Sequence, residues 1–241
     1  MKIGFIGGTG NIGQCVLRNL VSYPEEQVSQ VVCINRRKAN PEELPQDQSR
    51  IVEHVVDMSP GTDVEPLFAD ALSDIDVLVA TIGIGSGKGD VETFRWVEVE
   101  LATACARAGI EAGARKAVLL TSSGTDINAK KSWLLSSVAG GFYFHLKGQV
   151  EKNFTDLGFE QGTHIFRPAG LLGTQHVPGI VDTLMPAVDW LAPARWRSIH
   201  IEKLGYAMAA VAVRSEDSSA SVIYQGEDLF GLLPGKRWQK N

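Results

Sequence analysis

The chain opens with the segment Met1-Lys-Ile-Gly-Phe-Ile-Gly-Gly-Thr-Gly-Asn-Ile-Gly13, in which an apolar stretch runs directly into a cluster of glycines. Gly8, Gly10 and Gly13 match the spacing G-x-G-x-x-G, and Gly7, Gly10 and Gly13 match the wider spacing G-x-x-G-x-x-G. Between a strand and a helix, such glycines allow a tight turn, a close approach to a pyrophosphate and close packing of the helix on the strand. The first N–H groups of the helix favour an anion. The segment predicts a dinucleotide-binding site, with a purely structural glycine turn as the alternative.

Short segments rich in valine and isoleucine alternate along the chain with longer segments of helical period. The predicted strands are residues 2–6, 28–35, 51–56, 76–82, 116–121, 164–167 and 221–224. The predicted helices are residues 12–21, 63–72, 91–112, 142–157 and 203–213. Strands that are apolar on both faces are typical of a parallel sheet covered by helices. The pattern predicts an α/β fold of the Rossmann type, a doubly wound parallel sheet of about seven strands.

The domain organisation follows from the absence of a low-complexity linker. We expect a single NAD(P)-binding domain over residues 1–241. Residues 168–200 contain Pro168, Pro178, Pro186 and Pro193. Because proline interrupts helices and central strands, this stretch predicts a small irregular lobe on the substrate side of the sheet.

The composition limits the classes of function. With 241 residues, of which 44% are hydrophobic, the chain can form one well-cored domain. The net charge of −5 offers no basic surface for nucleic acid. The five histidines show no metal-ligand spacing. We expect neither a nucleic-acid partner nor a metal.

Three features predict a soluble cytoplasmic protein. The first strand begins at residue 2, with no targeting segment before it. The apolar run over residues 133–146 has 14 residues, fewer than the ~20 needed to cross a bilayer. The chain has an odd number of cysteines, Cys15, Cys33 and Cys105, which lie far apart in the sequence among apolar residues. This pattern is typical of core thiols in a reducing compartment.

The end of the second predicted strand bears on the choice of nucleotide. NAD-binding sheets place an acid about 20 residues beyond the glycines to bind the ribose hydroxyls. This chain instead has Arg36, Arg37 and Lys38 there. A guanidinium pairs well with a 2′-phosphate, so the sequence favours NADP(H) over NAD(H), with a solvated basic turn as the alternative. Asp57, after the third strand, is a candidate for the adenine amino group or a solvent-facing loop carboxylate.

The segment Tyr143-Phe-His-Leu-Lys147 places a tyrosine and a lysine four residues apart on a predicted helix. Side chains at this spacing share one face, so the ammonium lies near the phenol. A nearby cation favours the phenolate, which suits Tyr143 to exchange a proton with a carbonyl or an alcohol. The same spacing also occurs where a tyrosine and a solvated lysine merely share a helix face.

Two serines follow the predicted strand 116–121, in the sequence Thr121-Ser122-Ser123-Gly124. Ligands bind at the carboxyl ends of strands in open α/β sheets. Either hydroxyl could hold a substrate oxygen that faces Tyr143, and either could instead cap the following helix. Ser122 and Ser123 therefore both remain candidates at this stage.

These motifs together resemble those of the short-chain dehydrogenase/reductase superfamily, in its extended or atypical branch. The glycine motif, the serines, Tyr143-x-x-x-Lys147 and Arg167-Pro168-Ala169-Gly170 follow the order of that superfamily. More narrowly, the chain is similar to the Tat-interacting-protein group of NADPH-binding Rossmann proteins. That likeness rests on residues 83–89, 119–124, 146–151 and 166–168, and the resemblance as a whole covers most of residues 1–175.

The resemblance implies catalytic roles for Ser123, Tyr143 and Lys147. Tyr143 would be the general acid and base, and Lys147 would bind the nicotinamide ribose and favour the ionised tyrosine. Ser123, with Ser122 as the next choice, would hold the substrate oxygen. The complete set of candidate cofactor-binding residues is Gly7, Gly8, Thr9, Gly10, Asn11, Ile12, Gly13, Arg36, Arg37, Asp57, Gly83, Lys147 and Pro168.

The chain also departs from the pattern of the superfamily at two places. The fourth predicted strand ends in Ala80-Thr81-Ile82-Gly83, where standard reductases have Asn-Asn-Ala-Gly. The gap of 20 residues from Ser123 to Tyr143 is longer than in standard members, so we expect residues 125–136 to form an outward loop. The first departure fits an atypical member. Neither departure removes the cofactor site, and both count against the standard turnover cycle of the superfamily.

We expect an NADPH-dependent oxidoreductase that transfers a hydride to a small-molecule carbonyl, with Tyr143 as general acid. One alternative is an NADPH-binding regulator or assembly factor with little or no turnover, which would act on a protein partner. A nucleotide-sugar epimerase is a third hypothesis, although such chains usually carry a larger C-terminal lobe. By analogy with relatives, residues 91–112 and 142–157 could form the seam of a homodimer.

Overall fold

A computed structural model describes residues 1–84, 90–129, 141–174, 192–215 and 218–234 of the chain. In this described part, seven parallel strands form one sheet in the order β3-β2-β1-β4-β5-β6-β9. The strands are β1 (Lys2–Ile6), β2 (Gln30–Asn35), β3 (Ile51–Val55), β4 (Val77–Ala80), β5 (Lys116–Leu120), β6 (Thr163–Phe166) and β9 (Val222–Tyr224). Each overlaps a predicted strand, with ends that differ by up to two residues, so the predicted doubly wound parallel sheet is confirmed.

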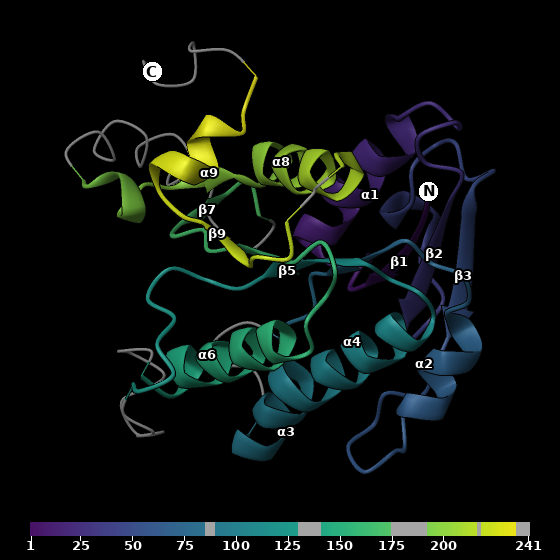
Figure 1. Ribbon diagram of the computed structural model, residues 1–241, viewed down its shortest axis with the longest axis horizontal. Helices are drawn as coiled ribbons and strands as arrows, with labels where there is room; N and C mark the ends of the chain where they lie inside the picture. The colour runs from purple at the N-terminus through teal and green to yellow at the C-terminus, as the bar shows by residue number, and fades with distance from the viewer. Residues whose placement is uncertain (85–89, 130–140, 175–191, 216–217, 235–241) are drawn as a thin grey trace.

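Helices cover both faces of this sheet (Figure 1). One face carries α1 (Asn11–Ser22), α8 (Ile201–Val213) and α9 (Glu227–Gly231), and the other carries α2 (Glu65–Ala71), α3 (Val91–Arg95), α4 (Ala102–Glu111) and α6 (Gly141–Asp156). Two apolar clusters fill the two layers. Phe5, Leu17 and Met208 belong to the first, and Leu78 and Phe154 belong to the second. Every residue of the central strand β4 is buried, as expected for a strand between two helical layers.

The glycine turn after β1 is the tightest point of the fold. Gly7 adopts a φ of +91°, in the left-handed region that favours glycine. A Cβ atom on Gly13 would lie 2.0 Å from the carbonyl oxygen of Gly7. The same added atom on Gly8 would have its nearest neighbour at 3.7 Å, an ordinary contact. The steric demand therefore falls on Gly7 and Gly13, which both belong to the wider spacing.

The helix predicted over residues 91–112 differs from expectation. It is divided into α3, a π-helical segment η2 (Trp96–Leu101) and α4. The wider turn of a π-helix cannot be told from the apolar pattern, because that pattern continues through it. Such short π-helical insertions are frequent at functional sites.

The described parts of the expected irregular lobe contain more regular structure than predicted. Strand β7 (Leu171–Leu172) pairs in parallel with β8 (Ile199–His200), and a 3-10 turn, η3 (Ala194–Trp196), precedes β8. Outside this lobe, another 3-10 turn, η1 (Pro41–Glu43), follows β2. Residues 175–191 of the lobe, with Pro178 and Pro186, lie outside the described residues. Among the described helices, none is both long and apolar enough to span a bilayer.

We predict that Gly13→Ala lowers the free energy of unfolding by about 1–3 kcal/mol, because the new methyl group must push the turn away from the helix. Gly8→Ala, in the same turn but with room for a methyl group, should stay within about 0.5 kcal/mol of wild type. Denaturant unfolding of the nucleotide-free protein measures the free energy of unfolding of both variants. Equal stabilities for the two variants would contradict the close packing of α1 on the turn.

Candidate functional site

The predicted site residues gather at one edge of the sheet. Since all the described strands of this sheet are parallel, their carboxyl ends meet at the same edge. Hydrogen bonds join neighbouring strand ends there. Thr81 Oγ1, after β4, donates to the Gly7 carbonyl at 3.0 Å, and the Ser123 N–H, after β5, donates to the Pro168 carbonyl at 2.7 Å. The structure thus brings the glycine turn, the serine segment and Pro168 to one edge.

The arginines after β2 have different surroundings. Arg37 forms a double hydrogen bond with the Glu43 carboxylate, with distances of 2.6 and 2.8 Å. This contact from the Arg37 guanidinium holds the pKa of Glu43 below its usual value. Arg36 is exposed and makes no hydrogen bond or ion pair with the residues that the structure describes. Arg36 is therefore the guanidinium available to an anion.

Asn35 and Glu53 form a polar contact beside this turn that the sequence-based analysis did not identify. Asn35, the last residue of β2, is 4% exposed and donates through Nδ2 to Glu53 Oε1 at 2.8 Å. Glu53 Oε1 also accepts the N–H of Ala39 at 3.0 Å. Asn35 Oδ1 is buried and has no partner within the described ranges. A buried acceptor without a donor is costly, so Oδ1 fits a ligand hydroxyl at this edge.

Asp57 is engaged in a local turn. Its Oδ1 accepts the N–H of Ser59 at 3.0 Å and the hydroxyl of Ser59 at 2.6 Å. These contacts with Ser59 hold the pKa of Asp57 below its usual value. This geometry fits a loop carboxylate that faces solvent better than a carboxylate free to bind the adenine amino group. The contact of Asp57 with adenine stays a prediction.

Tyr143 and Lys147 lie one turn apart on α6, as the spacing predicts. The Lys147 ammonium lies 5.6 Å from the centre of the Tyr143 ring. Lys147 is 5% exposed, whereas Tyr143 is partly exposed. Lys147 Nζ also lies 2.6 Å from Glu98 Oε2, in a buried ion pair. The site therefore contains a counter-ion for Lys147 that the sequence-based analysis missed.

Burial by itself would lower the pKa of Lys147, because it penalises the charged form. The Glu98 carboxylate, Tyr143 and Glu151 together outweigh this penalty, with Glu98 contributing most, and the pKa of Lys147 is raised above its usual value. Lys147 is therefore a fixed positive charge beside the Tyr143 ring.

A signal for Glu98 was present in the sequence. Glu98 lies four residues after Phe94 and three before Leu101, so it falls on the apolar face of its helix. An acid on a buried face requires a partner. Besides Lys147, the segment after β4 supplies a partner for Glu98, because the Ile84 N–H donates to Glu98 Oε1 at 3.1 Å. A Cβ atom on Gly83 would lie 3.1 Å from that oxygen, so the predicted site residue Gly83 leaves room for the carboxylate.

The two candidate serines differ in their hydrogen bonds. Ser123 Oγ lies 3.1 Å from the Arg167 carbonyl oxygen and 3.0 Å from that of Arg195, and it accepts from Gln225 Nε2 at 3.2 Å. Ser122 Oγ is buried and has no hydrogen-bond partner among the described residues. The Ser123 hydroxyl therefore holds separate segments together, and the Ser122 hydroxyl is available.

A second ion pair, in which Glu151 is buried and Arg167 is partly buried, contacts the same helix. Glu151, one turn beyond Lys147, pairs with Arg167 after β6, with Arg167 Nε at 2.9 Å from Oε1. The Thr121 hydroxyl donates to the same carboxylate oxygen at 2.6 Å. These contacts attach α6 to the carboxyl ends of β5 and β6.

The first part of the predicted outward loop packs closely on α6. A Cβ atom on Gly148 would lie 2.4 Å from the backbone nitrogen of Ile127, and His145 Nδ1 lies 2.6 Å from the Ile127 carbonyl oxygen. Residues 130–140 lie outside the described residues. The loop therefore begins against the helix that carries Tyr143.

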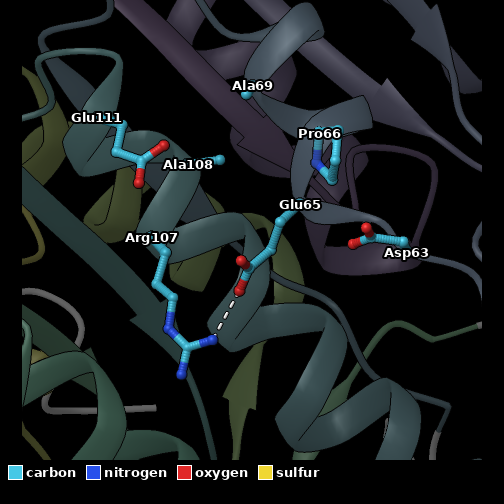
Figure 2. Close-up of a pocket in the computed structure, with 7 residues that line it drawn as sticks. All are labelled: Asp63, Glu65, Pro66, Ala69, Arg107, Ala108 and Glu111. Atoms are coloured by element: carbon cyan, nitrogen blue, oxygen red, sulfur yellow. Dashed lines mark hydrogen bonds and ion pairs between the residues drawn. The ribbon is translucent and has the colours of Figure 1, made fainter.

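A surface hollow elsewhere on the molecule is shown in Figure 2. Its lining residues, from α2, α4 and the segment before α2, are Asp63, Glu65, Pro66, Ala69, Arg107, Ala108 and Glu111. Arg107 and Glu65 form an ion pair of 2.6 Å across it, and both side chains are about half exposed. None of the predicted site residues lines this hollow. Over the described ranges, no cluster of three His, Cys, Asp or Glu side chains is arranged to hold a metal ion.

The chain is similar in sequence to proteins from several fungi. No protein-family model matches the chain. The protein fmp52-1 of Aspergillus terreus is 30% identical over 176 residues, which cover 72% of this chain and 68% of that protein. The chain belongs to the FMP52 family. The Neurospora crassa member, fmp-52, is 27% identical over 241 residues, which cover 97% of this chain and 88% of its own length.

Solved structures share the fold of this FMP52 protein. The oxidoreductase ylbE from Lactococcus lactis matches 96% of each chain with a TM-score of 0.64 at 17% identity. WbmH from Bordetella bronchiseptica, solved in complex with NAD+, has a TM-score of 0.64 at 18% identity over 93% of this chain and 75% of that one. These structures therefore confirm the fold that the resemblance to extended short-chain dehydrogenases/reductases implies. The narrower likeness to the Tat-interacting-protein group stays a prediction.

The predicted cytoplasmic location is wrong. The FMP52 relatives from Coccidioides immitis, Candida albicans and Neurospora crassa are named mitochondrial proteins, and they point to mitochondria. The prediction relied on where the first strand begins and on the apolar surroundings of the cysteines. Burial raises the pKa of Cys15, Cys33 and Cys105 to about 12. Such thiols are unreactive in any compartment, so they do not distinguish one from another.

We predict that Ser123→Ala lowers the free energy of unfolding by about 1–2 kcal/mol, because buried partners of the hydroxyl are left unsatisfied. Ser122→Ala removes a buried hydroxyl without a partner and should stay within about 0.5 kcal/mol of wild type. Thermal or denaturant unfolding measures both variants. A larger loss for Ser122→Ala than for Ser123→Ala would contradict these assignments.

Proposed function

We propose that this FMP52 protein binds NADP(H) at the carboxyl edge of the sheet and reduces a carbonyl compound. The observation that carries the proposal is the buried, charged Lys147 beside the partly exposed Tyr143 at the end of the sheet where the glycine turn lies. A tyrosine so placed can give its proton to a substrate oxygen. The single domain predicted over residues 1–241 would carry both the cofactor site and the substrate lobe of residues 168–200.

The residues of this edge fit a dinucleotide. The turn from Gly7 to Gly13 brings the backbone and the first N–H groups of α1 to the place of a pyrophosphate. The orphaned Oδ1 of Asn35 suits a ribose hydroxyl. Arg36, which has no partner in the described structure, suits a 2′-phosphate. The enzymes in the NAD complexes that share this fold, such as WbmH, support a nicotinamide dinucleotide in general terms.

The chemistry assigned to the protein's own side chains is proton transfer and positioning. When bound, NADPH supplies the hydride that adds to the carbonyl carbon. Tyr143 donates its phenolic proton to the carbonyl oxygen, which gives an alcohol, and Lys147 holds a positive charge beside the phenol. Ser122, whose hydroxyl is not engaged elsewhere in the described structure, is the better candidate than Ser123 to hold the substrate oxygen.

We predict that Arg36→Ala weakens NADPH binding by about tenfold or more and leaves NADH binding nearly unchanged, because a charged hydrogen bond to the 2′-phosphate is lost. Arg37→Ala should have a smaller effect, since Arg37 is already paired with Glu43. Fluorescence titration with both nucleotides measures the ratio of affinities. Equal losses for NADPH and NADH in Arg36→Ala would contradict a 2′-phosphate contact.

We predict that Tyr143→Phe lowers turnover by about 10²-fold or more, because the proton donor is removed, while NADPH affinity stays within about twofold of wild type. NADPH oxidation against a panel of aldehydes, ketones and quinones measures turnover, and Tyr206→Phe on α8 is the control tyrosine. NADPH binding without turnover by the wild-type protein would favour the regulatory alternative. Turnover retained in Tyr143→Phe would remove Tyr143 from the mechanism.

A further inference from the structure

Glu98 is a buried acid of this edge to which the proposed reaction assigns no role. It is 2% exposed and lies in the π-helical segment η2, between α3 and α4. Its Oε1 accepts the Ile84 N–H at 3.1 Å, and its Oε2 lies 2.6 Å from Lys147 Nζ. Oε2 has no other partner within the described part of the chain. The Ile84 N–H therefore holds one oxygen of the Glu98 carboxylate, and the other oxygen contacts Lys147.

The charged groups around Lys147 show why Glu98 is its counter-ion. From η2 the ammonium faces Glu98, and from α6 it faces Tyr143 and Glu151. Glu151 is already paired with Arg167 after β6 and accepts the Thr121 hydroxyl. Glu98 is the carboxylate in direct ion-pair contact with Lys147 among the described residues. Within the described structure, Glu98 is thus the carboxylate that balances the charge of Lys147 at contact distance.

We propose that Glu98 is a positioning residue: its carboxylate holds the Lys147 ammonium beside Tyr143 and balances its charge. This inference rests on the proposed reductase function. It adds to that function a residue on a different helix, outside the Tyr-x-x-x-Lys motif. Gly83 leaves room for the Glu98 carboxylate, and Glu98 itself lies in the π-helical turn.

Loss of the Glu98 charge has a defined consequence. A buried ammonium without a counter-ion is unfavourable, so Lys147 would lose its proton at a lower pH than in wild type. The positive charge beside the phenol then disappears. The rate of carbonyl reduction is therefore expected to fall at a lower pH than in wild type.

The test compares Glu98→Gln with wild type in NADPH-dependent carbonyl reduction across pH. Glutamine keeps the side-chain volume and an oxygen that can accept the Ile84 N–H. We expect the alkaline fall of kcat to move about one pH unit or more to lower pH, with kcat at pH 7 reduced on the order of tenfold and KM nearly unchanged. Glu100→Gln is the matched control, because Glu100 is exposed and pairs with the exposed Arg95 at 3.1 Å. It should reproduce the wild-type profile.

The outcomes separate the inference from the function on which it rests. A wild-type protein that binds NADPH but reduces no carbonyl overturns the proposed reductase, and the positioning role with it. A wild-type reductase whose Glu98→Gln variant keeps the wild-type pH profile overturns the inference alone. A lower kcat without a shift in the profile also overturns it, since a merely structural residue would give that result.

A double-mutant cycle tests the ion pair without any assay of activity. Glu98→Gln and Lys147→Met each leave one buried charge unpaired and should lower the Tm, whereas the double variant should recover part of the loss. Additive losses would overturn the pairing. If Glu98→Gln does not fold, Glu98→Asp retains the charge with a shorter reach. It should lower kcat while leaving the pH profile in place, and an acid shift in Glu98→Asp would overturn the inference.

Discussion

The position of α6 depends on ion pairs that are buried on one side of the helix. Lys147 pairs with Glu98 and Glu151 pairs with Arg167, at positions one helical turn apart. A buried charge that loses its partner is strongly destabilising, so any rotation or sliding of α6 would be unfavourable at both places at once. The helix is therefore fixed relative to η2 and to the end of β6. Tyr143, one turn before Lys147, takes its position from this arrangement.

The ends of β5, β6 and β9 are joined by hydrogen bonds of a serine hydroxyl, not by ion pairs. The Ser123 hydroxyl contacts the backbone of Arg167 and Arg195 and the side chain of Gln225, which belong to three separate segments of the chain. This contact ties β5 to β6, to the segment before β8 and to the end of β9. The neighbouring Ser122 hydroxyl has no such task in the described structure. A fixed framework and an available hydroxyl thus lie side by side at the edge of the sheet.

Much of the fold was predictable because the relevant interactions are local. The alternation of strands and helices follows from periodicity, and the seven predicted strands correspond to the strands of the described sheet. The turn from Gly7 to Gly13 is determined within thirteen residues, since the required close contact is between Gly13 and Gly7. Tyr143 and Lys147 face each other because the helix repeat brings positions i and i+4 together.

The sequence by itself determined the α/β fold, the glycine turn and the Tyr143–Lys147 pair, all of which rest on short-range geometry. Only the tertiary structure paired Lys147 with Glu98 and distinguished Ser122 from Ser123. The reason is physical: whether a buried polar atom has a partner depends on segments that are distant in the chain and meet only when the sheet and helices pack. The spacing of residues along a helix cannot reveal such a partner.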